Sequence, residues 1–265
     1  DLEKQAALHG VELSVTDAVP TLENASLAAG CIGVSILGQG CIDAALLDAY
    51  HALGIRYLST RTIGYDHIDL DHARSIGLRV CSASYAPNGV ADFTVMMILM
   101  CLRHYKQALW RGQVNDFSLT GLQGREMKDL TIGIIGTGRI GAQVVRNLSG
   151  FGCRILAYDL RRNPAVEPQV TYVDFDTLLA QSDVITLHMP LLDSNRHIIN
   201  RESIAKMRDG VVIVNCSRGE LADIEALIEG IETGKIGALG MDTVEGDEGI
   251  IHADHRVDIL PNRNW

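Results

Sequence analysis

A glycine pattern in the middle of the chain offers the clearest chemistry. Gly136, Gly138 and Gly141 fit the spacing G-x-G-x-x-G, directly after the apolar stretch 131–135 and at the start of an amphipathic stretch. In a strand–turn–helix unit, the first glycine permits the tight turn, the second lets the backbone approach a pyrophosphate, and the third lets the helix pack against the strand. The helix N-terminus adds free N–H groups for the phosphates. The pattern predicts a dinucleotide site; its alternative is a glycine turn that only packs.

An acidic residue indicates which dinucleotide is bound. Asp159 follows the expected strand 154–158. A carboxylate at this place accepts hydrogen bonds from the adenosine ribose hydroxyls and repels the 2′-phosphate of NADP. We therefore expect NAD as the cofactor, with Arg161 and Arg162 close enough in the sequence to weaken that preference.

Four further segments carry a resemblance to a known family. They are residues 59–69, 85–92, 187–191 and 215–223. With the glycine pattern, they resemble the D-isomer-specific 2-hydroxyacid dehydrogenases, and most closely the D-lactate dehydrogenase branch. The resemblance implies an NAD-dependent oxidoreductase that reduces a 2-keto acid, such as pyruvate, to a D-2-hydroxy acid. It also implies a homodimer that pairs through its NAD domains.

The same resemblance assigns substrate contacts. Arg218 matches the family's substrate arginine, whose planar guanidinium grips a carboxylate with two hydrogen bonds and polarises the neighbouring ketone. Ile63 and Gly64 match a turn whose backbone N–H groups hold the substrate carboxylate. Tyr85 matches a tyrosine that faces the substrate in the lactate branch. The alternatives are a surface arginine, a turn glycine, and a tyrosine packed against the interdomain helix.

Further cofactor contacts are implied in the same way, and most of them would use the backbone. His188 matches a position that shapes the cofactor pocket and is not expected to be a catalytic base. Asp242 matches an acid near the nicotinamide carboxamide, with a helix N-cap as its alternative. The remaining implied cofactor residues are Arg139 and Ile140 in the glycine turn, Met189, Pro190 and Asn195 in the loop under the cofactor, and Cys216, Ser217 and Arg218 beside the nicotinamide ribose.

The sequence departs from the family pattern at two catalytic places. Asp247 stands where the family has a glutamate that pairs with the catalytic histidine and raises its pKa; Glu245 or Glu248 could substitute if the loop shifts. The family's histidine lies in a later Pro-His dipeptide, which this sequence does not contain. His252 and His255 are better explained as solvated loop residues. We therefore expect a chain cut at both ends, with a cofactor site and a carboxylate grip but little activity.

Alternating strands and helices must position these residues, which is the pattern of an α/β fold with parallel sheets. We expect two Rossmann-like domains: an incomplete, flavodoxin-like substrate domain over 1–99 and a C-terminally incomplete NAD-binding domain over 100–265. A long helix over 90–110 either crosses between them or is an ordinary buried helix. The expected strands are 33–37, 55–58, 78–81, 131–135, 154–158, 183–187, 210–214 and 238–241. The other expected helices are 2–8, 43–53, 72–76 and 139–148.

Composition excludes several classes. The net charge of −10 over 265 residues argues against a nucleic-acid or membrane-surface binder. No apolar run approaches the ~20 residues of a membrane span. The 6 cysteines form no CxxC pair or zinc-like cluster, so we expect reduced thiols, no metal and a cytoplasmic protein. Two other functions remain alternatives to a D-lactate dehydrogenase-like enzyme. One is a dehydrogenase for an aryl, branched or glutarate-type substrate, and the other is an NAD-sensing protein resembling the family's corepressors.

Overall fold

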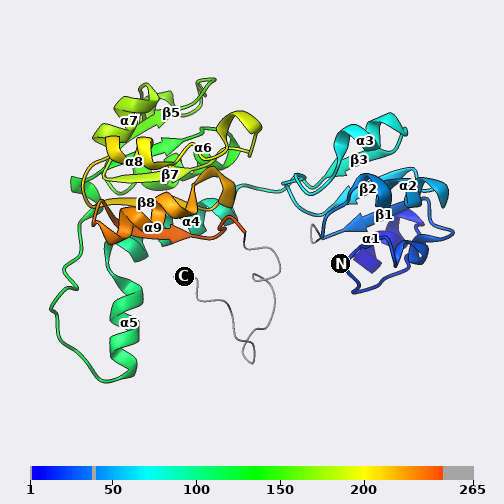
Figure 1. Ribbon diagram of the computed structural model, residues 1–265, viewed down its shortest axis with the longest axis horizontal. Coiled ribbons are helices and arrows are strands. Elements are labelled where there is room, and N and C mark those ends of the chain that lie inside the picture. The colour runs from blue at the N-terminus through cyan, green and yellow to red at the C-terminus, as the bar shows by residue number, and fades with distance from the viewer. Residues whose placement is uncertain (1, 38–39, 247–265) are drawn as a thin grey trace. The chain divides into compact units, whose positions relative to one another are not determined.

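The chain forms two compact units, which are described separately. The structure is a computed structural model that describes residues 2–37 and 40–246. The units are Asp1–Tyr85 and Ala86–Trp265 (Figure 1). This division falls before the boundary expected at 99/100, because the helix that begins at Asn88 packs on elements of the second unit.

The first unit is built on a three-stranded parallel sheet. Its strands pair in the order β1-β2-β3. Asp43 and Asp69 each accept a hydrogen bond from the first turn of the helix that follows, which fixes where those helices begin. Apolar side chains such as Leu46 and Leu58 fill the core between helices and sheet. The elements are α1 (Leu2–His9), η1 (Ala25–Ala28), β1 (Gly33–Ile36), α2 (Ala44–Ala52), β2 (Tyr57–Thr60), α3 (Leu70–Ser75) and β3 (Arg79–Ser82).

The second unit contains a six-stranded parallel sheet in the order β6-β5-β4-β7-β8-β9. Its central strands are fully buried apolar runs, as expected for a parallel sheet covered by helices on both faces. The strand order reverses between β4 and β7, where such sheets bind ligands beyond the carboxyl ends of their strands. The strands are β4 (Thr131–Ile135), β5 (Arg154–Tyr158), β6 (Thr171–Tyr172), β7 (Val184–Leu187), β8 (Val211–Asn215) and β9 (Ile236–Met241).

Helices cover this sheet. Residues of α4 and α6 share one hydrophobic core with β4 and β8, whereas α7, α8 and α9 pack in a second core. The helices are α4 (Asn88–Leu102), α5 (Tyr105–Gln113), α6 (Arg139–Ser149), α7 (Phe175–Gln181), α8 (Arg201–Lys206) and α9 (Ile224–Glu232), with short 3-10 turns η2 (Met127–Asp129), η3 (Glu167–Gln169), η4 (Asp193–Asn195) and η5 (Gly219–Leu221). No helix in the described part of the chain is long and apolar enough to cross a membrane.

The single helix predicted over 90–110 is wrong. It is broken into α4 and α5 at His104, whose φ of 49° lies in the left-handed region. The carbonyl of Leu102 accepts a hydrogen bond of 3.0 Å from the backbone N–H of Arg125, a residue on the returning chain. Because that bond replaces the next helical one, α4 ends there. The apolar run also stops at Leu102, so α5 has no core to follow.

Candidate active site

The residues predicted to bind the cofactor follow successive strands of the six-stranded sheet. In the strand register, Leu187 lies opposite both Ile135 and Asn215, and Asn215 lies opposite Met241. The segments that begin at Gly136, His188, Cys216 and Asp242 therefore leave the sheet side by side at its carboxyl edge. The backbone N–H of Gly136 bonds to the carbonyl of Tyr158, which brings the end of β5 to the same edge.

The glycine turn is shaped to leave space for a ligand. Gly136 has a φ of 93°, and a Cβ there would lie 2.6 Å from the carbonyl oxygen of His188. A Cβ on Gly141 would overlap the carbonyl oxygen of Gly136. At Gly138 a Cβ would meet nothing within 4 Å, so this backbone borders open space at the start of α6. Two glycines are thus required by the fold, and the third is where a pyrophosphate could approach the chain.

Asp159 is tied to that turn by its carboxylate. Oδ2 accepts from the backbone N–H and the hydroxyl of Thr137, at 2.6 and 3.0 Å, and Oδ1 accepts from the N–H of Arg161. The Thr137 hydroxyl also accepts from the hydroxyl of Tyr172 at 2.8 Å. The carboxylate of Asp159 therefore lies against the glycine turn, where it could accept hydrogen bonds from an adenosine ribose.

Arg218 lies in the turn that follows β8. Its carbonyl accepts from the side-chain amide of Asn215 at 2.7 Å, and its Nη1 donates to the carbonyl of Ser217 at 2.8 Å. The hydroxyl of Ser217 donates to the carbonyl of Leu187, linking the turn to β7. Burial raises the pKa of the Cys216 thiol to about 11, so this thiol is protonated and unreactive at neutral pH.

Asp242 directly follows β9, where its backbone N–H donates to the carbonyl of Asn215 at 3.0 Å. Its side chain is exposed, and no helix of the described chain begins after it. The N-cap alternative therefore has no structural support within residues 2–37 and 40–246. Asp247, His252 and His255 lie outside the described residues.

The loop after β7 is held together by contacts of the Asn195 side chain. The side chain of Asn195 accepts from the backbone N–H of Leu192 and donates to the carbonyl of Pro190, both at 2.8 Å. Its amide also lies 3.3 Å from the sulfur of Met189. The three residues predicted to lie under the cofactor thus form one connected loop.

His188 is buried beside the glycine turn. Its Nε2 lies 3.1 Å from the hydroxyl of Thr186, and its Nδ1 is buried without a hydrogen-bond partner in the described structure. Burial lowers the pKa of this imidazole to about 4, so the ring is neutral at physiological pH. A buried, neutral ring that underlies the turn agrees with a role in shaping the pocket.

Sequence and structure comparisons decide the family. Residues 95–262 match the description "D-isomer specific 2-hydroxyacid dehydrogenase, NAD binding domain". The chain is 42% identical over 254 residues to an aromatic 2-oxoacid reductase of Clostridium sporogenes, covering 95% of this chain and 76% of the relative. The chain belongs to the D-isomer specific 2-hydroxyacid dehydrogenase family. It is an NAD-dependent enzyme of this family, and it acts on 2-oxoacids.

Solved structures agree with that assignment. The apo structure of D-lactate dehydrogenase from Escherichia coli superimposes with a TM-score of 0.84 at 39% identity, covering 94% of this chain and 79% of that one. A D-lactate dehydrogenase with NAD⁺ from Lactobacillus jensenii gives a TM-score of 0.80 at 32% identity, covering 98% and 80%. The residues of this dehydrogenase fit NAD: the open backbone at Gly138 and the acid at Asp159 lie at the same sheet edge.

Two of the predicted substrate residues of the first unit, Ile63 and Gly64, lie in the loop after β2. The hydroxyl of Thr62 donates to the carbonyl of Gly64 at 2.6 Å and lies 2.5 Å from the hydroxyl of Thr60, so the turn containing Ile63 and Gly64 is held by two threonines. Tyr85 ends this unit and is 48% exposed.

Sequence reasoning missed several residues that shape the site. Thr137 occupies a variable place of the glycine pattern, yet it joins Asp159 to Tyr172. Asn163 donates from its side chain to the carbonyl of Thr137 at 2.8 Å. Among residues 2–37 and 40–246, no group of histidine, cysteine or acidic side chains could hold a metal ion.

Proposed function

We propose that this dehydrogenase reduces a small 2-keto acid, with pyruvate as the preferred size class, to the D-2-hydroxy acid. The observation that carries the 2-keto acid class is the place of Arg218, in the turn after β8, on the edge where the glycine turn also begins. The preference for pyruvate rests on the resemblance to the D-lactate dehydrogenase branch. A guanidinium fork beside the nicotinamide position is suited to grip a carboxylate while the neighbouring ketone receives a hydride.

Each proposed group has a separate task. When bound, NADH supplies the hydride. Arg218 takes the substrate carboxylate and orients the ketone carbon, since positioning contributes much of the rate in such reactions. By resemblance to the family, the backbone N–H groups of Ile63 and Gly64 are proposed to bind the substrate carboxylate, and Tyr85 is proposed to face the substrate. Asp247 is proposed to pair with the family's acid/base histidine and keep it protonated near neutral pH.

The cofactor would be held by the turn and the loops of the same edge. Gly136, Gly138 and Gly141, with the backbone of Arg139 and Ile140, are proposed to receive the pyrophosphate at the start of α6. Asp159 would accept from the ribose hydroxyls. Met189, Pro190 and Asn195 would line the cofactor from below, and Cys216, Ser217 and Asp242 would lie beside the nicotinamide end.

The substrate class can be tested with a panel of 2-keto acids. Relatives named for lactate and for aromatic 2-oxoacids have similar identity to this chain, so the panel compares substrates with side chains of different size. Full-length protein with NADH should give its highest kcat/KM with pyruvate, compared with 2-ketoisocaproate, phenylpyruvate and 2-ketoglutarate. A kcat/KM for phenylpyruvate at least about tenfold above that for pyruvate would reassign the substrate to the aromatic class, since a methylene in an apolar pocket changes discrimination by ~10-fold or more.

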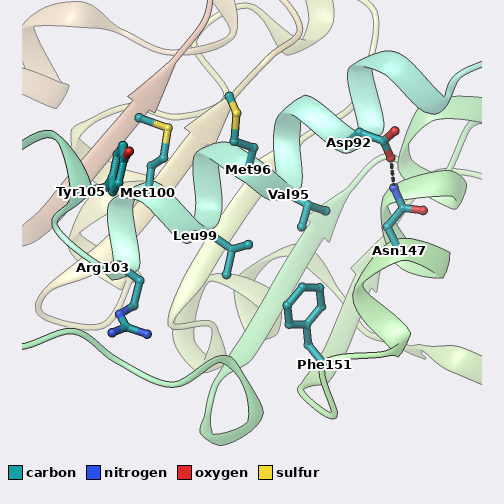
Figure 2. A pocket seen from close by; sticks show the side chains of 9 residues that line it. All are labelled: Asp92, Val95, Met96, Leu99, Met100, Arg103, Tyr105, Asn147 and Phe151. Carbon is teal, nitrogen blue, oxygen red and sulfur yellow. Dashed lines mark hydrogen bonds between the residues drawn. The ribbon is translucent and has the colours of Figure 1, made fainter. Parts of the chain in front are cut away.

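We also propose that the enzyme is a homodimer that pairs through its NAD domain. Two surfaces of the second unit support this. An open groove of about 780 Å³ runs along α4, lined by apolar side chains that include Met96, Leu99, Met100 and Phe151 (Figure 2). Its polar rim includes a hydrogen bond of 2.7 Å between Asn147 and Asp92.

The second surface is the arm, defined as residues 105–122. It comprises α5 and the loop after it, and it extends away from the second sheet (Figure 1). Trp110, Phe117 and Leu119 are 70%, 78% and 83% exposed. The arm is braced internally, because Arg111 donates to the carbonyl of Thr120 at 2.6 Å. An exposed aromatic arm and an apolar groove on one chain match a two-fold pair in which each arm enters the other groove.

A further inference from the structure

One cluster of charged and polar side chains in the second unit lies next to the site, and none of its residues has a role in the function proposed above. Glu245, four residues from the end of β9, directs its carboxylate to two neighbouring residues of another loop. Oε2 lies 2.8 Å from Nε2 of His197, and Oε1 accepts from Nη2 of Arg196. The side chain of Glu245 is only 21% exposed, so its charge is less screened than that of a surface pair.

The partner loop is itself held in place. His197 has a φ of 52°, a left-handed conformation that an ordinary residue keeps only when its surroundings fix it. Its backbone N–H donates to the carbonyl of Glu220 at 2.8 Å, and its carbonyl accepts from the side chain of Asn200 at 2.9 Å. Arg196 and His197 thus project from a loop that is anchored to the turn that follows β8.

The segment that carries Glu245 touches the arginine turn directly. A Cβ on Gly219 would overlap the backbone of Val244 and Glu245, so these two segments are in backbone contact. Gly219 is buried and immediately follows Arg218. Any outward movement of 244–245 would therefore remove the surface against which the arginine turn rests.

We propose that Glu245, Arg196 and His197 form a latch that positions the turn of Arg218. Arg196 and His197 hold Glu245, and the backbone at Glu245 holds Gly219 in place. None of the three is proposed to touch the substrate, so all are positioning residues. The inference rests on the role proposed for Arg218. Both carboxylate oxygens of Glu245 are engaged within the fold, which favours Asp247 over Glu245 as the proposed partner of the catalytic histidine.

The test compares variants of the latch with matched controls in the full-length enzyme. Glu245→Ala removes both bonds, whereas Glu245→Gln keeps the shape and one acceptor oxygen. His197→Asn shortens the side chain but retains a residue that tolerates the left-handed conformation. The matched controls are Glu229→Ala and Glu229→Gln, which make the same two substitutions in a pair of 2.7 Å between Glu229 on α9 and Arg201 on α8. Each variant is assayed for pyruvate reduction, NADH affinity and melting temperature.

The latch predicts that the variants lose activity toward pyruvate while their affinity for NADH stays nearly unchanged. In Glu245→Ala, kcat/KM for pyruvate falls at least about fivefold, mainly through KM, because a coupled network typically loses this much when one member is removed. Glu245→Gln recovers activity to within about threefold of the unmodified enzyme, and NADH affinity stays within about twofold throughout. His197→Asn gives the same split with a smaller loss, so the test stands if Glu245→Ala does not fold.

Three results would overturn the latch. The first is kinetic constants in Glu245→Ala and His197→Asn that equal those of Glu229→Ala. The second is a lower melting temperature with unchanged kinetics, and the third is a parallel loss of NADH affinity. An unmodified enzyme that reduces none of the tested 2-keto acids would overturn the proposed function together with the latch, whereas an active parent with silent variants overturns the latch alone.

Discussion

The carboxylate of Asp159 accepts hydrogen bonds from the glycine turn, and we propose that it also accepts them from the cofactor ribose. In the structure its Oδ2 accepts from Thr137, which ties the acid to the turn before any cofactor contact is made. The sequence predicts the acid because it follows a strand at the family's position. The hydroxyl of Tyr172, which donates to the hydroxyl of Thr137, comes from β6. This strand has only two residues and is too short to be predicted from an apolar pattern.

Replacing Asp159 with serine should change cofactor choice. The loss of the carboxylate removes a ribose acceptor and the repulsion of a 2′-phosphate, so NADH affinity should fall and NADPH affinity should rise. Fluorescence titration with both cofactors measures this. Asp209→Ser is the control, because Asp209 precedes β8 at the opposite edge of the sheet. Equal affinity of the unmodified protein for NADH and NADPH would count against the assignment.

His188 should make stability depend on pH. Burial lowers its pKa from an ordinary value of 6.5 to about 4 in the folded state. Between these values the unfolded chain binds more protons than the folded one, so stability falls as the pH falls and loses nothing further below about 4.

The size of this effect can be measured by urea unfolding. From pH 7 to pH 4.5 the contribution of His188 should decrease by about 2 kcal/mol. His188→Gln has no proton to bind, so its free energy of unfolding should change less over the same range by about that amount. Parallel pH profiles for the two proteins would show that the ring is not buried as described.

At the scale of elements, apolar runs identify the central strands, because a strand covered on both faces has only apolar side chains to show. Strands β4 and β5 are confirmed at their predicted bounds. The sequence shows only that the apolar run stops at Leu102. The bond that ends α4, between Leu102 and Arg125, joins residues that are distant in the sequence and could not be predicted. The same holds for the latch at Glu245.

Two alanine substitutions in the glycine turn should have different consequences. At Gly138 a methyl group would meet only open space, so Gly138→Ala should fold normally but lose NADH affinity by at least tenfold, about 1.4 kcal/mol. At Gly141 a methyl group would overlap the carbonyl of Gly136, so Gly141→Ala should also lower the melting temperature. Gly150→Ala, where a methyl group meets nothing within 4 Å, is the control. If Gly138→Ala binds NADH like the unmodified protein, the pyrophosphate does not lie at this turn.

At the scale of the whole molecule, the arm and the groove predict self-association. Trp110→Ser should raise the dimer dissociation constant at least about 30-fold, equivalent to ~2 kcal/mol for one truncated aromatic anchor. Sedimentation velocity over a concentration series measures this. Ile231→Ser on α9 removes an apolar side chain that is 42% exposed, away from the arm, and should leave the constant unchanged. Equal effects from the two substitutions would refute the proposed interface.

The central claim is that Arg218 grips the carboxylate of a 2-keto acid beside bound NADH. The most direct measurement is the kinetics of Arg218→Lys in the full-length enzyme, because lysine keeps the charge but loses the planar fork. The control is Arg154→Lys, at the start of β5 on the opposite edge of the sheet. We predict that kcat/KM for pyruvate falls at least about 100-fold, as for the loss of a buried charge pair of ~3 kcal/mol, while NADH affinity stays within about twofold. A loss of less than about tenfold, the equivalent of 1.4 kcal/mol, or an equal loss in the control, would contradict the claim.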